Sequence, residues 1–197
     1  MIRNTRDRIL DAGLKLFSTK GYLGATTKEI AKTAGVAELT LFRHFTSKEG
    51  LFEEVLKENS FLTVLRGLIP EISGLPYEQA MFEVAGRLLE TMAERKEMIR
   101  IMHSEISRYP EKIHEIYHSF IDEMIDTLGA YFEGLIRRGV VRECDTALAA
   151  RAFFGMFYAY FNANEVMLRK KYRAMDTDKV VAEFVKIFVK GTLRPGA

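Results

Sequence analysis

The chain has 197 residues, of which 48% are hydrophobic, 28% charged and 11% aromatic, and its formal net charge is +2. This apolar share is typical of globular proteins and excludes an intrinsically disordered chain. The single cysteine, Cys144, excludes a disulfide framework and a multi-cysteine zinc site. The longest uncharged apolar run, Ala152–Phe161, has ten residues, whereas a membrane-spanning helix needs about 20. We therefore expect a cytoplasmic protein with no signal peptide and no membrane contact.

The charge is distributed unevenly along the chain. Residues 1–50 contain nine Lys or Arg and five acidic residues, whereas the rest of the chain contains 20 basic and 22 acidic residues. A basic N-terminal part on a slightly acidic body favours a polyanionic partner for that part. Chance can give an excess of this size, so the charge alone leaves both interpretations open.

Helical spacing of apolar residues runs through nearly the whole chain, and no segment alternates as a strand would. The predicted fold class is therefore all-α, with about nine helices. Helices are predicted over residues 5–19, 27–34, 38–45, 48–68, 76–94, 97–107, 110–138, 146–170 and 177–191.

Two short predicted helices, 27–34 and 38–45, are separated by a tight turn. Thr26 and Glu29 have the capping-box spacing that marks a helix start, and Gly35 allows the chain to turn sharply. Two short helices joined by a glycine-containing turn are typical of the helix-turn-helix motif, whose second helix enters the major groove of DNA. An ordinary helical hairpin has the same pattern, so the motif alone leaves that alternative open.

Helical spacing also predicts which side chains of the second helix face outward. It turns Leu41 and Phe45 inward, and Ser47 is expected to cap the next helix. Lys48 then lies beside free backbone amides, an arrangement that suits a phosphate. The outward residues are Glu38, Leu39, Thr40, Arg43 and His44.

Residues 8–55 closely resemble the DNA-binding domain of the TetR (tetracycline-repressor) family of bacterial regulators. The matching pieces are Ile9-Leu10-Asp11-Ala12, Leu16-Phe17, Lys20-Gly21-Tyr22, Thr26-Thr27, Ile30-Ala31, Ala34-Gly35-Val36, Leu41-Phe42, His44-Phe45 and Ser47-Lys48-Glu49 with Leu51. The rest of the chain resembles the family only in its helical layout and size. We therefore expect a three-helix DNA-binding domain over residues 1–47 and a helical effector-binding and dimerisation domain over residues 48–197.

The resemblance implies contacts with double-stranded operator DNA. Phosphate contacts would come from Thr27, His44 and Lys48, and base contacts from Lys28, Leu39, Thr40 and Arg43. Two positions depart from the family pattern. Ala37 replaces the frequent Ser or Thr, which removes a helix cap, and Phe42 replaces the usual Tyr, so we expect it to pack on a sugar or a thymine methyl. Glu38 would either accept a hydrogen bond from a cytosine amino group or remain a solvated acid at the helix start.

Two C-terminal segments are apolar on more than one face. Segment 147–161 is apolar nearly all round, so it must be covered on every side. We expect segments 146–170 and 177–191 to pair across a two-fold axis in a homodimer that reads a near-palindrome; a buried central helix in a monomer is the alternative. The residues expected at this interface are Ala149, Ala152, Phe153, Met156, Tyr160, Val181, Phe184, Val185 and Phe188.

The rest of the core is expected to hold a small apolar or amphipathic effector, as the family habit implies. Met and aromatic side chains suit adaptable apolar pockets, although plain core packing would use the same residue types. The expected lining is Met98, Met102, Phe120, Met124, Phe153, Phe157 and Tyr158, with His103 or Asn162 as the polar group. No cofactor is expected.

One enzyme motif competes with this interpretation. His114-Glu115-Ile116-Tyr117-His118 fits the H-E-x-x-H pattern of zinc peptidases. The extended pattern needs a glycine and a third histidine, where this chain has Ile121 and Met124. We therefore expect no catalytic residue and no resident metal.

The predicted function is that of a DNA-binding transcriptional regulator. Specifically, we expect a dimeric repressor that is released by its effector, with the predicted helix 48–68 as the lever between the two domains. A zinc-dependent hydrolase and a ligand-independent architectural DNA-binding protein are the alternatives.

Overall fold

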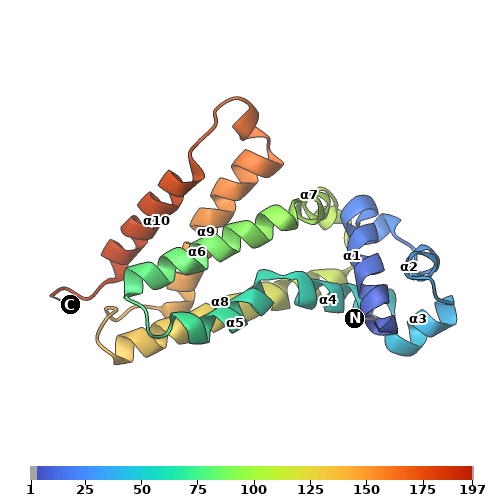
Figure 1. Cartoon of the computed structure of the whole chain (residues 1–197), viewed down its shortest axis with the longest axis horizontal. Helices are drawn as coiled ribbons and strands as arrows, with labels where there is room; N and C mark the ends of the chain where they lie inside the picture. The colour runs from blue at the N-terminus through green and yellow to red at the C-terminus, as the bar shows by residue number, and fades with distance from the viewer. Residues whose placement is uncertain (1–3, 197) are drawn as a thin grey trace. The chain divides into compact units, whose positions relative to one another are not determined.

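The computed structural model describes residues 4–196, which form an all-helical fold and confirm the predicted class (Figure 1). The helices are α1 (Thr5–Gly24), α2 (Thr27–Ala34), α3 (Glu38–His44), α4 (Lys48–Asn59), α5 (Phe61–Ile72), α6 (Tyr77–Glu94), α7 (Lys96–Glu105), α8 (Glu111–Arg137), α9 (Thr146–Phe161) and α10 (Thr177–Thr192). Short 3₁₀ or π segments cover Ile106–Arg108, Asn162–Val166 and Arg169–Lys171. Within residues 4–196, none of the helices has the length and apolar character of a membrane span.

Packing divides the chain into two compact units. The first contains the residues up to Ser60 together with Arg95–Ser119, and the second contains Phe61–Glu94 and the residues from Phe120 onward. Residues 48–60 and 95–119 therefore pack with the helices of the expected DNA-binding domain. The functional boundary after residue 47 stays a prediction.

The first unit is built around α1, which packs against α2, α4 and α7. Three aromatic side chains meet in its core: the rings of Phe17 and Phe52 lie 5.1 Å apart, as do those of Tyr22 and Phe52. Edge-to-face pairs of this kind contribute about 0.5–1.5 kcal/mol each beyond their buried area. Because Leu41 of α3 is fully buried in the same cluster, this core also fixes the orientation of α3.

The second unit is built around α6, which packs against α5, α9 and α10. Its centre is aromatic: the ring of Phe153 lies 5.0 Å from the ring of Phe157 and 5.0 Å from that of Phe188. Helices α9 and α10 are also in contact with each other, and Figure 1 shows them leading into and out of the same loop.

Two helices predicted to be continuous are interrupted. The predicted helix 48–68 is wrong, because α4 ends at Asn59 and Ser60 has an extended backbone with φ −97° and ψ 164°. The side chains of Asn59 and Ser60 bond to carbonyl oxygens of their own helix and so compete with its continuation. The predicted helix 146–170 is also too long: α9 ends at Phe161, and Leu168 has a left-handed backbone with φ 58°.

Candidate nucleic-acid interface

The turn between α2 and α3 has the geometry that the sequence predicts. Thr26 and Glu29 form the capping box at the start of α2. Gly35 ends α2 in the left-handed conformation, with φ 67° and ψ 40°, and its N–H donates to the carbonyls of Ala31 and Lys32. Glycine adopts this conformation without steric cost, so α2 ends abruptly and the chain enters α3.

Arg8 of α1 holds this turn, which sequence reasoning did not foresee. Its guanidinium donates to the carbonyl oxygen of Ala34 and, at 2.9 Å, to that of Gly35. Carbonyls at a helix C-terminus have no partner within the helix, so a cation that bonds them stabilises the helix end. Only its place in the fold distinguishes Arg8 from the other basic residues of this region.

Replacing Gly35 with alanine is expected to lower the unfolding free energy by about 1–2 kcal/mol, the cost of a left-handed residue with a side chain. The added Cβ would also lie 2.9 Å from Nη2 of Arg8 and would displace that side chain. Urea unfolding measures the change. Gly50→Ala is the matched control, because a Cβ there meets no atom closer than 3.7 Å. Equal stability of the two variants would contradict the role given to Gly35.

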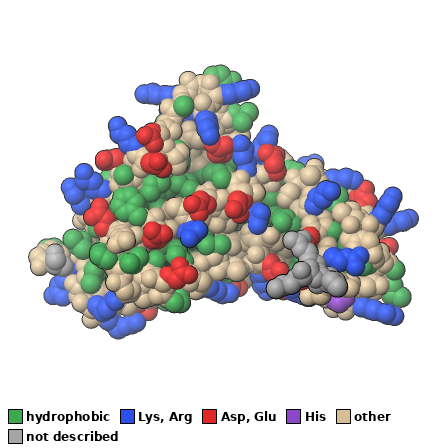
Figure 2. All heavy atoms as spheres, in the orientation of Figure 1, with side chains coloured by type: hydrophobic (Ala, Val, Ile, Leu, Met, Phe, Trp, Pro, Cys, Tyr) green, Lys and Arg blue, Asp and Glu red, His purple; other side chains and the backbone are tan. Residues whose placement is uncertain are grey.

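The surface of α3 combines exposed apolar and cationic side chains. Leu41 and Phe45 are buried, which confirms their predicted inward orientation. Leu39 is 67% and Phe42 43% exposed, and Arg43 and His44 are exposed on the same helix. Figure 2 shows several Lys and Arg side chains, among hydrophobic ones, along the edge where Figure 1 places α2 and α3. This surface can meet phosphates with its cations and bases with its apolar side chains.

Glu38 does more than either alternative that the sequence left open. Its carboxylate accepts a hydrogen bond of 2.6 Å from the hydroxyl of Thr27, which joins α2 to the start of α3. The Thr27 hydroxyl that is predicted to contact a phosphate is therefore already bonded to the Glu38 carboxylate. A phosphate that takes the Thr27 hydroxyl as donor must break this bond.

Lys48 is held at the start of α4 by its neighbours. Its ammonium lies 4.3 Å from the centre of the Tyr22 ring, and the Tyr22 hydroxyl donates to Glu49 at 2.8 Å. Burial lowers the pKa of Lys48, while the charges of Glu49 and Glu105 act in the opposite direction. Ser47 caps this helix by accepting from the amide of Gly50, as expected. The ammonium thus lies against the Tyr22 ring, on the first residue of α4.

A second glycine contact joins α1 to α7. Gly21 has φ 73° with an extended ψ of 173°, which kinks α1 where the sequence predicts its end. A Cβ at this position would overlap the Glu105 carboxylate, which also accepts from the amide of Leu23 at 3.5 Å. Glycine adopts this positive φ without strain and leaves room for the Glu105 carboxylate in its present position.

The residues expected to line an effector cavity are divided between the two units. Met98 and Met102 are buried in the core of the first unit, against the N-terminal helices, and His103 is exposed on the same helix. Phe153 and Phe157 pack in the second unit, so the expectation that they share a cavity with the two methionines stays a prediction. The second unit also contains Phe120, Met124, Tyr158 and Asn162.

The residues expected at a dimer interface fall into two groups. Phe153, Val185 and Phe188 are buried by their own chain, which corrects their expected position at a partner. The remaining ones are exposed or partly exposed: Ala149, Ala152, Met156, Tyr160, Val181 and Phe184. The sequence did not single out Leu148 and Ile187, which are 62% and 60% exposed.

The H-E-x-x-H histidines lie on α8. The His114 and His118 rings are stacked with centres 6.3 Å apart. Within residues 4–196, no group of three or more His, Cys, Asp or Glu side chains is arranged to hold a metal ion. The motif therefore has no third ligand in the described part of the chain.

Comparison with known proteins agrees with this geometry. Residues 9–55 match the model of bacterial regulatory proteins of the tetR family, and residues 79–191 match the C-terminal domain of AefR-like transcriptional repressors. The HTH-type transcriptional regulator YvkB of Bacillus subtilis is 32% identical over 96% of this chain and 98% of its own length.

Solved structures give the same result for the fold. A TetR-family regulator from Mesorhizobium loti superimposes with a TM-score of 0.75 at 24% identity, over 96% of both chains. The flavonoid-responsive regulator FrrA superimposes with a TM-score of 0.70 at 25% identity, over 98% of both chains. The chain therefore belongs to the TetR family of DNA-binding transcriptional regulators, with α2 and α3 as its helix-turn-helix motif.

Proposed function

We propose that this protein is a homodimeric repressor that binds a palindromic operator in the cytoplasm and releases it when a small effector binds. The exposed surface of α3 carries this proposal. It presents Arg43 and His44 beside Leu39 and Phe42, on a helix that Leu41 anchors in the core. A short helix held in this way can enter a major groove without reorganising.

Individual roles follow from position. Arg43 and Lys28 are exposed on α3 and α2 and would read bases, whereas Lys48, at the start of α4, would hold a phosphate. Thr27 would contribute a phosphate contact only after exchanging its bond to Glu38. Leu39, Thr40 and Phe42 would supply the apolar and hydroxyl contacts, with His44 on the backbone.

The proposal of a homodimer rests on α9 and α10. Leu148 and Ile187 leave large apolar side chains in water, and the exposed Ala152 lies on the same helix as Leu148. Two copies that pair these faces around a two-fold axis would cover them and would bring two α3 helices to one operator.

An effector in the second unit is supported by a polar group that has no partner. Oδ1 of Asn162 is buried and accepts no hydrogen bond from the described residues. Asn162 is also the first residue of the π-helical segment that follows α9. An unmet buried acceptor costs about 1–3 kcal/mol, so a ligand that donates to it gains affinity. Segments of π-helix are frequent at functional sites. The flavonoid response of FrrA is a precedent for an aromatic effector in a protein of this fold.

The test is binding of a palindromic DNA from the gene's own upstream region against random DNA, at two salt concentrations. Arg43→Ala is expected to weaken operator binding by about 5–150-fold and to relax sequence preference, because a bidentate base contact contributes about 1–3 kcal/mol. Lys48→Ala is expected to weaken binding to both DNAs and to lower the salt slope by about 1. Arg87→Ala is the control, since Arg87 is exposed on α6 in the second unit.

Other outcomes would favour the alternatives. Equal affinity for operator and random DNA would indicate an architectural protein. A zinc-dependent hydrolase would bind zinc stoichiometrically and would lose activity on Glu115→Gln. Neither alternative is favoured, because both family matches are to transcriptional regulators.

A further inference from the structure

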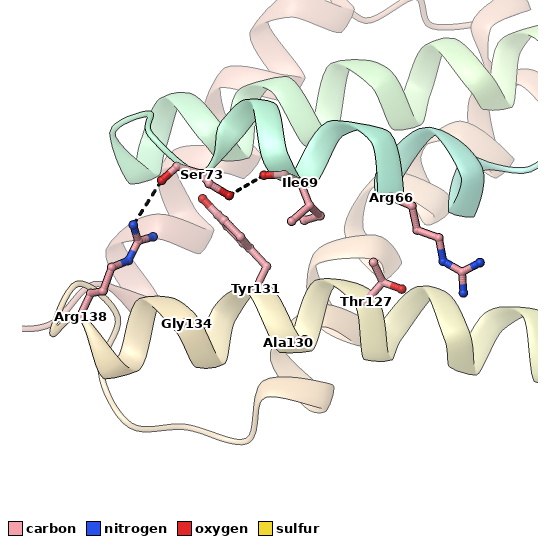
Figure 3. Close-up of a pocket in the computed structure, with 8 residues that line it drawn as sticks. All are labelled: Arg66, Ile69, Ser73, Thr127, Ala130, Tyr131, Gly134 and Arg138. Carbon is pink, nitrogen blue, oxygen red and sulfur yellow. Dashed lines mark hydrogen bonds between the residues drawn. The ribbon is translucent and has the colours of Figure 1, made fainter.

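A surface groove with a volume of about 470 Å³ lies between α5 and α8, within the second unit. None of the residues expected to bind an effector lines it. Figure 3 shows the ring of Tyr131 reaching from α8 towards Ser73, at the end of α5, with the guanidinium of Arg138 beside the same serine. Arg66 lies at the other end of the groove. The groove therefore has a cation at each end.

Tyr131 places an unsatisfied hydroxyl in this groove. The residue is only 8% exposed, and its Oη has no hydrogen-bond partner among the described residues. Burial raises the pKa of Tyr131, so at neutral pH the hydroxyl keeps its proton and can donate. Buried polar groups in folded proteins nearly always have a partner. The hydroxyl therefore needs an acceptor that the described residues do not supply.

Arg138 lies close enough to Tyr131 for its charge to act on the pKa of that hydroxyl, against the effect of burial. Its guanidinium donates one N–H to the carbonyl of Ser73 at 3.2 Å, and a guanidinium has five N–H donors. At the other end, Arg66 pairs with Glu123 at 2.8 Å. Among the described residues that line the groove, Arg66 has an acidic partner and Arg138 has none, so one positive charge is left uncompensated, which matches a monoanion.

The space between the charged ends is apolar and open. Ala130 and Gly134 are one turn apart on α8, and their small size leaves space on this side of the groove. A Cβ added to Gly134 would meet nothing nearer than Arg137 Nη2, at 3.9 Å. Ile69 and the ring of Tyr131 supply apolar walls. An apolar chain or ring fits along this surface more readily than a polar one.

We propose that the α5–α8 groove binds an organic acid with an apolar body. One carboxylate oxygen accepts from Arg138, the other accepts from the Tyr131 hydroxyl, and the apolar body lies over Ala130 against Ile69. The hydroxyl itself has no surface open to water, so the groove must open to admit the acid, and the exposed Arg138 side chain is a lining group that can move. Binding at the groove does not depend on DNA; only its consequence for the operator rests on the proposed function.

The test uses three matched probes on the full chain, by calorimetry below their micelle concentrations: decanoate, 1-decanol and decyltrimethylammonium. Decanoate is expected to bind, and both others at least about 10-fold more weakly, since hydrogen bonds to a charged group contribute about 1.5–3 kcal/mol. Arg138→Gln and Tyr131→Phe are each expected to weaken decanoate binding by about 10-fold. Tyr131→Phe also removes the unmet hydroxyl, so its thermal midpoint without ligand should rise, which a folding defect cannot produce.

Two further variants separate the groove from general effects. Arg137→Gln removes the neighbouring cation, which pairs with Glu133 and does not line the groove, and should leave decanoate affinity unchanged. Ala130→Leu fills the groove without removing a polar group and should abolish binding. The proposal is wrong if Arg138→Gln and Ala130→Leu bind decanoate as the wild type does, or if decanol binds as tightly as decanoate.

An operator-binding arm separates this proposal from the proposed function. Decanoate that binds through Arg138 without changing operator affinity supports the groove and excludes it as the effector site. No decanoate binding by a chain that still binds its operator overturns the groove and leaves the repressor function intact. Release of the operator by decanoate in the wild type, lost in Ala130→Leu, supports both.

Discussion

The substitution Ala152→Arg is expected to convert the proposed dimer into monomers. Ala152 is exposed on α9, the helix that also leaves Leu148 in water. In a two-fold interface each substitution occurs twice, so Ala152→Arg places two like charges in a surface that the dimer would remove from water. Like charges brought together in an interface cost several kcal/mol. Sedimentation equilibrium measures the change in mass.

The loss of the dimer should carry over to DNA. A monomer binds one half-site only. In a dimer, binding of the first DNA-binding domain raises the effective concentration of the second one at its half-site, and this linkage increases affinity by about 10²–10⁴-fold. We expect operator affinity to fall by that factor in Ala152→Arg, although α3 is unchanged. Fluorescence anisotropy with the palindromic operator measures the fall.

The control places the same charge elsewhere in the second unit. Ala93 is exposed on α6, so Ala93→Arg should leave both the mass and the operator affinity unchanged. A dimeric Ala152→Arg protein with normal operator affinity would contradict the proposed interface. A monomeric Ala93→Arg protein would show that charge as such, rather than its position, controls association.

The DNA-binding helices could be predicted well because their signals are local. The capping box of Thr26 and Glu29, the left-handed Gly35 and the cap at Ser47 each act within a few residues. Backbone conformation at these positions follows from the residue itself and its nearest neighbours. The hydrogen bond from Thr27 to Glu38 could not be predicted in this way. Its two residues are eleven positions apart and come together only when the turn between α2 and α3 is packed.

Helix continuity and the membership of the core were harder to predict. Periodicity runs through Ser60 without a sign that α4 ends before it, because side-chain bonds to the backbone decide that end. The apolar spacing of Met98 and Met102 predicts that both are buried, but it does not indicate which of the two cores contains them. Here that core belongs to the N-terminal helices.

The α5–α8 groove had no sequence signal at all. Tyr131 and Arg138 are seven residues apart on the same side of a long amphipathic helix, which is the spacing of ordinary core and surface residues. They form one end of a groove only because Ser73, at the end of α5, lies beside both of them. An unsatisfied hydroxyl is a property of the packed molecule, so a single sequence cannot reveal it.

The substitution Phe153→Ala is expected to lower the free energy of unfolding by about 3–5 kcal/mol, the usual cost of removing an aromatic side chain from a core. Phe153 is fully buried, and its ring lies 5.0 Å from those of Phe157 and Phe188. The sequence suggested two other roles for this residue, in a dimer interface and in an effector cavity. In either role a truncation would alter association or ligand affinity more than the stability of the chain.

Met156→Ala on the same helix is the matched comparison. Met156 is partly exposed, so its truncation should cost less than that of Phe153 in urea unfolding but should weaken the dimer more. Both variants must be unfolded at one protein concentration, because the stability of a dimer depends on concentration. A Phe153→Ala protein as stable as the wild type, with weakened association, would place Phe153 at the interface. A large stability loss with unchanged association of the folded fraction would identify it as the centre of the aromatic core.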